Sequence, residues 1–110
     1  MEIKTISRDE LKAKIDRGDD FELVMTLNEW AFDAAHIPGS INISSVEAGA
    51  RLLKPADTIV VYCSDEACVA SQMAYRALTE GGYGNVRRYA GGLSDWSDAG
   101  YPLEGHSAGG

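Results

Sequence analysis

Cysteine is scarce in this chain of 110 residues, which contains only Cys63 and Cys68. In a reducing compartment, two cysteines are more often reactive or redox-active than joined in a structural disulfide. Together with His36 and His106 they match no zinc-ligand spacing such as C-x2-C, and they form no thioredoxin-like C-x-x-C. The sequence therefore predicts no metal site and no other cofactor, and it leaves the two cysteines as candidates for thiol chemistry.

Long apolar runs are also missing. No run approaches the roughly 20 residues that a membrane span needs. The first ten residues, MEIKTISRDE, lack the apolar core of a signal peptide. We therefore expect a cytoplasmic protein without a membrane partner.

Basic residues are outnumbered, with 10 Lys and Arg against 17 Asp and Glu and a net charge of −7. This excess of negative charge opposes binding to nucleic acid or to an anionic membrane surface. The chain has no internal repeat or linker, and its length suits one compact domain. We expect a single domain over residues 1–104 and a mobile, small and polar tail over residues 105–110.

The most informative stretch is 58–78, TIVVYCSDEACVASQMAYRAL. Its apolar run at 59–62 predicts a strand buried on both faces of a parallel sheet, and Cys63 stands where that strand ends. Apolar residues at helical spacing then predict a helix that packs on the sheet and stops at Gly81. They are Val69, Ala70, Met73, Ala74, Ala77 and Leu78. Cys63 therefore opens a strand-to-helix loop.

That placement gives Cys63 a chemical role. A loop that leads to a helix N-terminus points unpaired backbone N–H groups at its centre, where they favour an anion such as a thiolate or a persulfide. Thiols at such positions have pKa values of roughly 3.5 to 7.5 in place of about 8.5. We therefore interpret Cys63 as a candidate nucleophile. Cys68, read as one turn into the helix, is either a reactive thiol or an inert residue of the core.

The remaining chain alternates strands and helices. Strands are predicted at 21–27, 41–43 and 86–89, with a short edge strand at 3–6. Helix starts are predicted from capping residues, which are Ser7 with Glu10, Asn28, and Ser44 with Glu47. This alternation predicts an α/β fold.

Five polar or aromatic side chains along these elements have alternative interpretations. Trp30 and Phe32 indicate core filling rather than an aromatic binding site. His36 precedes a Pro-Gly turn and is interpreted as a hydrogen-bonding brace rather than a general base. The pair Arg87 and Arg88 is expected on a solvated strand face, unless it turns toward Cys63.

Three separated pieces of this sequence resemble the rhodanese-like domain. They are AHIPGSINI at 35–43, IVVYC with its loop and helix at 59–78, and GYGNVRRYAGGLSDWSDAGYPLEG at 82–105. The resemblance implies a three-layer α/β fold with a five-stranded, mostly parallel sheet flanked by helices. It also implies a sulfurtransferase that accepts sulfane sulfur on Cys63 as a persulfide and passes it to a thiol or another nucleophile. The implied partners are a small sulfur donor or a persulfide-carrying protein, and a thiol acceptor.

The candidate active-site loop departs from the C-x-x-G-x-R-S pattern that many members of the family resemble. It comprises Cys63, Ser64, Asp65, Glu66, Ala67 and Cys68, with Glu66 at the glycine position and Cys68 at the arginine position. Two carboxylates repel an anionic donor such as thiosulfate. We therefore expect weak use of thiosulfate and better use of a less charged persulfide. The segment 25–27, Met-Thr-Leu, also lacks the Asp-Val-Arg that is common there in the family.

Two other functions are alternatives to sulfur transfer. A phosphatase of the related dual-specificity class needs a C-x5-R loop, and the sixth residue after Cys63 is Val69, which excludes it. A catalytically weak binding or redox-sensor module that uses Cys63 and Cys68 is the alternative. In that module or in the enzyme, Cys68 is a possible resolving thiol, because a loop that doubles back brings two cysteines within the Cα separation of roughly 4.4 to 6.8 Å of a disulfide. The competing interpretation is that Cys68 fills a small apolar space.

Overall fold

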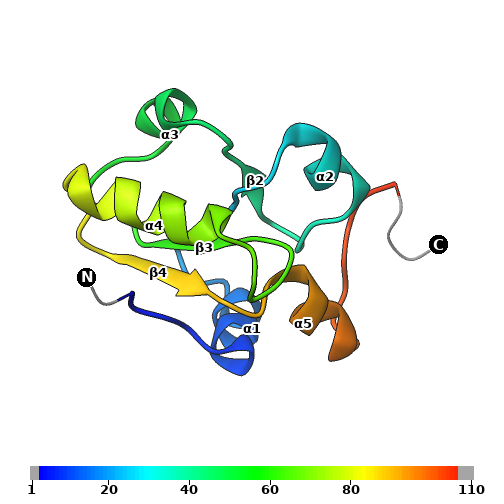
Figure 1. Cartoon of the computed structure of the whole chain (residues 1–110). Coiled ribbons are helices and arrows are strands. Elements are labelled where there is room, and N and C mark those ends of the chain that lie inside the picture. The colour runs from blue at the N-terminus through cyan, green and yellow to red at the C-terminus, as the bar shows by residue number, and fades with distance from the viewer. Residues whose placement is uncertain (1–2, 107–110) are drawn as a thin grey trace.

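The computed structural model describes residues 3–106, and its centre is one parallel sheet with the strand order β2-β1-β3-β4. The strands are β1 (Glu22–Met25), β2 (Ile41–Asn42), β3 (Ile59–Tyr62) and β4 (Val86–Tyr89). The helices are α1 (Arg8–Arg17), α2 (Glu29–Ala34), α3 (Val46–Leu52), α4 (Ala70–Glu80) and α5 (Gly92–Asp98). Helices α3 and α4 cover one face of the sheet, and α1 and α5 cover the other (Figure 1). The predicted three-layer α/β fold is confirmed.

Strand β3 lies at the centre of the sheet. It pairs in parallel with β1 through Met25 and Tyr62, and with β4 through Tyr62 and Tyr89. All four of its side chains are buried, as expected of a continuous apolar run in a parallel sheet. Because the strands are parallel, their carboxyl ends meet at one edge of the sheet. Cys63 leaves β3 at that edge.

The sheet has four strands among the described residues, where five were expected. The segment predicted as an edge strand at 3–6 is reduced to one bridge between Thr5 and Arg88. Arg88 donates its backbone N–H to the carbonyl of Lys4 at 2.8 Å, and Ile6 donates to the carbonyl of Arg88 at 3.1 Å. The pairing with β4 does not extend further, because the Ile6 side chain is buried in the core and the next residue, Ser7, caps α1.

Alternation along β3 divides the core into two apolar clusters, one on each face of the sheet. Val60 and Tyr62 face the cluster that α1 and α5 cover, together with Leu11 and Trp96. Ile59 and Val61 face the cluster under α3 and α4, which includes Tyr75. Burial on both faces fixes the position of β3, and with it the position of Cys63.

Local capping signals place most helix starts. Ser7 accepts a hydrogen bond from the N–H of Glu10 at 3.1 Å, and Asn28 accepts one from Ala31 at 2.9 Å, so both predicted caps are confirmed. The predicted cap of α3 was wrong by one residue. Ser45, and not Ser44, accepts from Ala48 at 3.2 Å.

Two interpretations of apolar side chains need correction. Trp30 is 76% exposed and fills no core, because α2 has only six residues and buries none of them fully. Phe32 does pack against the core cluster beneath α2. Val69, just before α4, and Met73, on α4, are 61% and 65% exposed, and the buried side chains of α4 are Ser71 and Tyr75.

The C-terminal segment returns to α2. Glu104 and His36 form an antiparallel bridge, and the N–H of His106 donates to the carbonyl of Asp33 at 3.0 Å. The remainder of the predicted tail, residues 107–110, lies outside the described residues. Within residues 3–106, every helix is too short or too polar to traverse a lipid bilayer.

Candidate functional site

The loop between β3 and α4 brings the two cysteines together. Cys63 and Cys68 form a disulfide, with their Cα atoms 6.2 Å apart. Cys63 is only 1% exposed, whereas Cys68 is half-buried. Helix α4 begins at Ala70, so Cys68 lies in the loop before the helix and not one turn inside it. Of the two orientations open to Cys68, toward Cys63 or into the core, the structure has the first.

Asp65 organises the turn of this loop. Its carboxylate accepts a hydrogen bond from the N–H of Ala67 at 3.0 Å, and its carbonyl accepts one from the N–H of Cys68 at 3.2 Å. Two N–H groups of the loop that was predicted to bind an anion are therefore bonded to Asp65. The side chains of Asp65, Glu66 and Ala67 are exposed, and Ser64 is half-buried. The loop thus exposes two carboxylates to solvent, and two of its N–H groups are already bonded within the loop instead of facing an anion.

The start of α5 holds the first residues of the loop. Leu93 donates its N–H to the carbonyl of Cys63 at 3.0 Å, and Ser94 donates to the carbonyl of Ser64 at 2.8 Å. Gly92 has φ +65°, and a Cβ at this position would overlap the carbonyl oxygen of Cys63. Glycine is therefore required here both for backbone conformation and for the close approach of α5 to the loop.

Arg88 donates hydrogen bonds to the second half of the loop, a role that the sequence did not predict. It is 7% exposed, and its Nε donates to Ser71 Oγ at 2.9 Å. Its Nη2 donates to the carbonyls of Glu66 at 3.0 Å and Cys68 at 3.4 Å. The alternation of side chains along β4 could have predicted the burial of Arg88. It assigns Arg88 to the buried face that Val86 shares, and Arg87 to the opposite face. Arg87 is exposed, as predicted, and pairs with Glu10 at 3.1 Å.

Replacing Arg88 with methionine is expected to lower the free energy of unfolding by about 2 to 4 kcal/mol, because it leaves two loop carbonyls and a buried hydroxyl without their donor. Arg87→Met is the matched control on the same strand. It removes only an exposed ion pair and is expected to change stability by about 0.5 kcal/mol or less. Urea unfolding of the two variants measures the difference, and equal losses would contradict a supporting role for Arg88.

Two neighbouring polar groups are braces for the turn at 36–40. The hydroxyl of Tyr62 accepts from the N–H of Ile37 at 3.0 Å and lies 2.8 Å from Ser40 Oγ. Burial raises the pKa of Tyr62 to about 12, so this hydroxyl keeps its proton at neutral pH. His36 stacks on Phe32 with 3.9 Å between ring centroids, and its Nδ1 lies 2.7 Å from the Phe32 carbonyl. These contacts match the bracing role predicted for His36.

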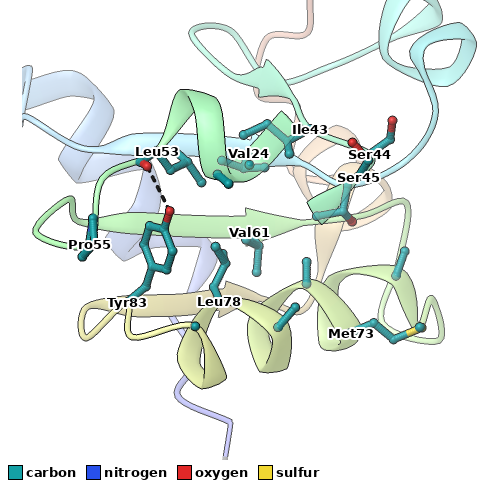
Figure 2. A pocket seen from close by; sticks show the side chains of 17 residues that line it. Val24, Ile43, Ser44, Ser45, Leu53, Pro55, Val61, Met73, Leu78 and Tyr83 are labelled. Atoms are coloured by element: carbon teal, nitrogen blue, oxygen red, sulfur yellow. Dashed lines mark hydrogen bonds between the residues drawn. The ribbon is translucent and has the colours of Figure 1, made fainter. Parts of the chain in front are cut away.

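An apolar groove of about 600 Å³ runs along the sheet between α3 and α4. Its floor includes Val24 and Val61, and one end closes where Tyr83 donates its hydroxyl to the Leu53 carbonyl at 2.9 Å (Figure 2). The opposite end carries Ser44 and Ser45 beside the carboxyl end of β3 (Figure 2). Ala70, which also lines the groove, lies two residues after Cys68 in the chain. The groove therefore offers uncharged surface near the loop.

Comparison with known proteins identifies the family of this chain. The family model of the rhodanese-like domain matches residues 7–99. The HTH-type transcriptional regulator Rv0324 of Mycobacterium tuberculosis is 35% identical over 101 residues, covering 90% of this chain and 44% of the regulator. The putative sulfur carrier protein YrkF of Bacillus subtilis is 29% identical over 97 residues, covering 86% of this chain and 51% of the carrier. The chain thus spans about half the length of these curated relatives.

A solved structure extends the agreement to the whole fold. The BH2092 protein from Bacillus halodurans superimposes with a TM-score of 0.88 at 23% identity, over 96% of this chain and 79% of that one. At this identity the likeness concerns the fold alone. The family match covers the strand, the loop with both cysteines, and the supporting residues Arg88 and Gly92. The chain therefore belongs to the rhodanese-like domain family.

Proposed function

We propose that the protein is a sulfurtransferase that carries sulfane sulfur as a persulfide on Cys63 and passes it to a thiol or another nucleophile. The observation that carries this proposal is the position of Cys63, at the carboxyl end of the central strand and inside the region that matches the family. Strand ends of this kind are the usual ligand sites of α/β sheets. The name of the Bacillus subtilis relative, a putative sulfur carrier protein, gives further support. We place the reaction in the cytoplasm, where the thiols that it needs are kept reduced.

The reaction begins after the Cys63–Cys68 disulfide has been reduced. The Cys63 thiolate attacks the sulfane sulfur of a donor and forms a new S–S bond, while the bond from that sulfur to the rest of the donor breaks. The rest of the donor leaves as a thiolate from a persulfide, or as sulfite from thiosulfate. An acceptor nucleophile then attacks the outer sulfur of the persulfide and restores the Cys63 thiolate. Hydrogen bonds from Leu93 and Arg88 to loop carbonyls hold the backbone of the site in place.

The loop charges favour an uncharged or weakly charged donor. The exposed carboxylates of Asp65 and Glu66 oppose the approach of a doubly charged anion such as thiosulfate. Asp65 also occupies the N–H of Ala67, which reduces the donors available to an anion. The nearby groove is mostly apolar in its lining and suits an organic carrier of sulfur. A small persulfide or a persulfide-carrying protein is therefore the donor that we propose.

Steady-state transfer tests this function. Reduced protein is supplied with glutathione persulfide or with thiosulfate, and cyanide serves as the acceptor so that thiocyanate is measured. Turnover above the rate without protein, with the persulfide preferred to thiosulfate, is the expected result. Absence of turnover with either donor, both in wild type and in Cys68→Ser, which cannot close the disulfide, would contradict the proposal.

Removal of the loop carboxylates is expected to raise thiosulfate turnover. The double variant Asp65→Ser with Glu66→Gly removes two charges, and each contributes about 1 kcal/mol of repulsion at 4 Å in water, so a gain of up to about thirtyfold is expected at low salt. The gain should shrink in high salt, because exposed charges are screened over about 8 Å at physiological ionic strength. Glu80→Gln, at the far end of α4, is the matched control and should change nothing. Unchanged turnover in the double variant would show that these carboxylates do not face the donor.

A redox-sensor module is the second candidate. It is favoured by the Cys63–Cys68 disulfide and by the name of the Mycobacterium tuberculosis relative, a transcriptional regulator of which this chain spans 44%. A sensor needs the disulfide to form and open reversibly, and it does not need sulfur transfer. Reversible thiol oxidation without sulfur uptake from a persulfide would favour this candidate over the enzyme.

A further inference from the structure

We propose that Cys68 converts the persulfide on Cys63 into free sulfide, so that the protein reduces persulfides at the expense of thiols. The inference rests on the proposed function, because it needs a persulfide on Cys63. Its basis is the disulfide, in which Cys68 Sγ is bonded to Cys63 Sγ. In a persulfide, that same Cys63 Sγ is the inner sulfur. The folded loop therefore brings Cys68 to the atom whose attack expels sulfide.

The chemistry balances without an external oxidant. The Cys68 thiolate attacks Cys63 Sγ, the bond from Cys63 Sγ to the outer sulfur breaks, and HS⁻ leaves with the electron pair. The outer sulfur is reduced to sulfide, and the two cysteines are oxidised to the disulfide. Summed with the loading step, one persulfide RSSH and the two thiols of the protein give RSH, H₂S and the disulfide. The disulfide of the structure is thus the product state of this step.

Backbone contacts hold Cys68 in position for this attack. Its N–H donates to the carbonyl of Asp65 at 3.2 Å, and its carbonyl accepts from Arg88 Nη2 at 3.4 Å. Arg88 is itself fixed by the buried Ser71. A nucleophile that is already positioned next to its target competes well against a thiol that must diffuse to it. Release of sulfide should therefore be faster than transfer when acceptor thiols are dilute.

The unequal burial of the two sulfurs sets the route of regeneration. Cys63 is 1% exposed and Cys68 is half-buried, so an external thiol reaches Cys68 Sγ first. Attack there forms a mixed disulfide on Cys68 and releases the Cys63 thiolate. A second external thiol attacks the mixed disulfide and frees Cys68, with one R′SSR′ formed for two R′SH consumed. Cys63 is then ready to accept sulfur again.

A single-turnover experiment tests the inference. Fully reduced protein, freed of reductant, is mixed with one equivalent of glutathione persulfide, and released sulfide and intact mass are measured. The wild-type chain should release about one sulfide per protein beyond the donor blank and become two hydrogens lighter. Cys68→Ser should release at least tenfold less sulfide and become heavier by one sulfur atom. Cys68→Ala is a second variant that leaves no hydroxyl near Cys63, and Glu80→Gln at the far end of α4 is a control that should behave as wild type.

The outcomes separate this inference from the function on which it rests. If wild type and Cys68→Ser both keep a stable persulfide, the inference is wrong and the sulfur-carrying function stands. If neither Cys68 variant takes up sulfur although both remain folded by circular dichroism, the proposed function fails and the inference fails with it. Sulfide release by wild type with disulfide formation, and a retained persulfide in both variants, supports both.

Discussion

Cys63→Ser is expected to abolish sulfur transfer from glutathione persulfide to cyanide, with a loss of about a thousandfold or more. A serine hydroxyl does not ionise near neutral pH and forms no persulfide, so the first covalent step is lost. The substitution changes one atom at the end of β3 and should leave the fold intact. Thiocyanate formation by the reduced variant measures the effect.

Cys68→Ser is the matched control for this experiment. Both variants lose the same disulfide, so their melting temperatures should agree within a few degrees and differences in transfer then report chemistry and not folding. Cys68→Ser should retain transfer to cyanide, because Cys63 keeps its sulfur until the acceptor arrives. Sulfur transfer that persists in Cys63→Ser would show that the nucleophile is misassigned.

Gly92→Ala is expected to produce the second large effect, a loss of about 3 kcal/mol or more in the free energy of unfolding together with loss of sulfur transfer. An alanine at φ +65° is strained, and its Cβ would also overlap the carbonyl of Cys63. The start of α5 must then move away from the loop, which breaks the hydrogen bonds from Leu93 and Ser94.

Gly100→Ala separates the two causes. Gly100 has a similar φ of +78°, and a Cβ there would meet no atom within 4 Å. Its replacement should therefore cost only the backbone strain, about 1 to 2 kcal/mol, and leave transfer unchanged. Urea unfolding and transfer assays on both variants measure this. Equal effects on stability and activity would argue against a close contact between α5 and the loop at 63–68.

The sequence predicted the part of the site that depends on local pattern. The continuous apolar run 59–62 identified the central strand, and the position of Cys63 followed from it. The caps at Ser7 and Asn28 followed from local hydrogen-bonding chemistry. At 44–45 two serines stand side by side, and only the backbone path decides which of them caps α3.

The features that were missed depend on contacts between distant segments. Arg88 is buried because a loop 20 to 22 residues earlier in the chain folds over it and supplies carbonyl acceptors. Alternation along β4 indicates that Arg88 shares the buried face of Val86, but it does not reveal these acceptors. Trp30 is exposed because α2 is too short to reach the core with every apolar side chain. The predicted fifth strand is reduced to one bridge because the side chain of Ile6 packs in the core, and the segment does not continue alongside β4.

The position of Cys68 illustrates the same limit. Spacing allowed a disulfide with Cys63 or burial of an inert thiol, and the spacing alone favoured neither. The turn that Asp65 closes directs Cys68 to Cys63, and Arg88 holds it there. The structure thus has the geometry that a resolving thiol requires, with 6.2 Å between the Cα atoms. The resolving role itself is the proposal tested by sulfide release.

Location of the sulfur by peptide mass spectrometry tests the central claim, that Cys63 is the sulfur acceptor, most directly. Reduced Cys68→Ser protein is treated with one equivalent of glutathione persulfide, blocked with an alkylating reagent and digested. We expect one added sulfur atom, on the peptide that contains Cys63, and its removal by prior treatment with cyanide. Sulfur absent from that peptide, while the protein is folded and the donor is active, would contradict the account.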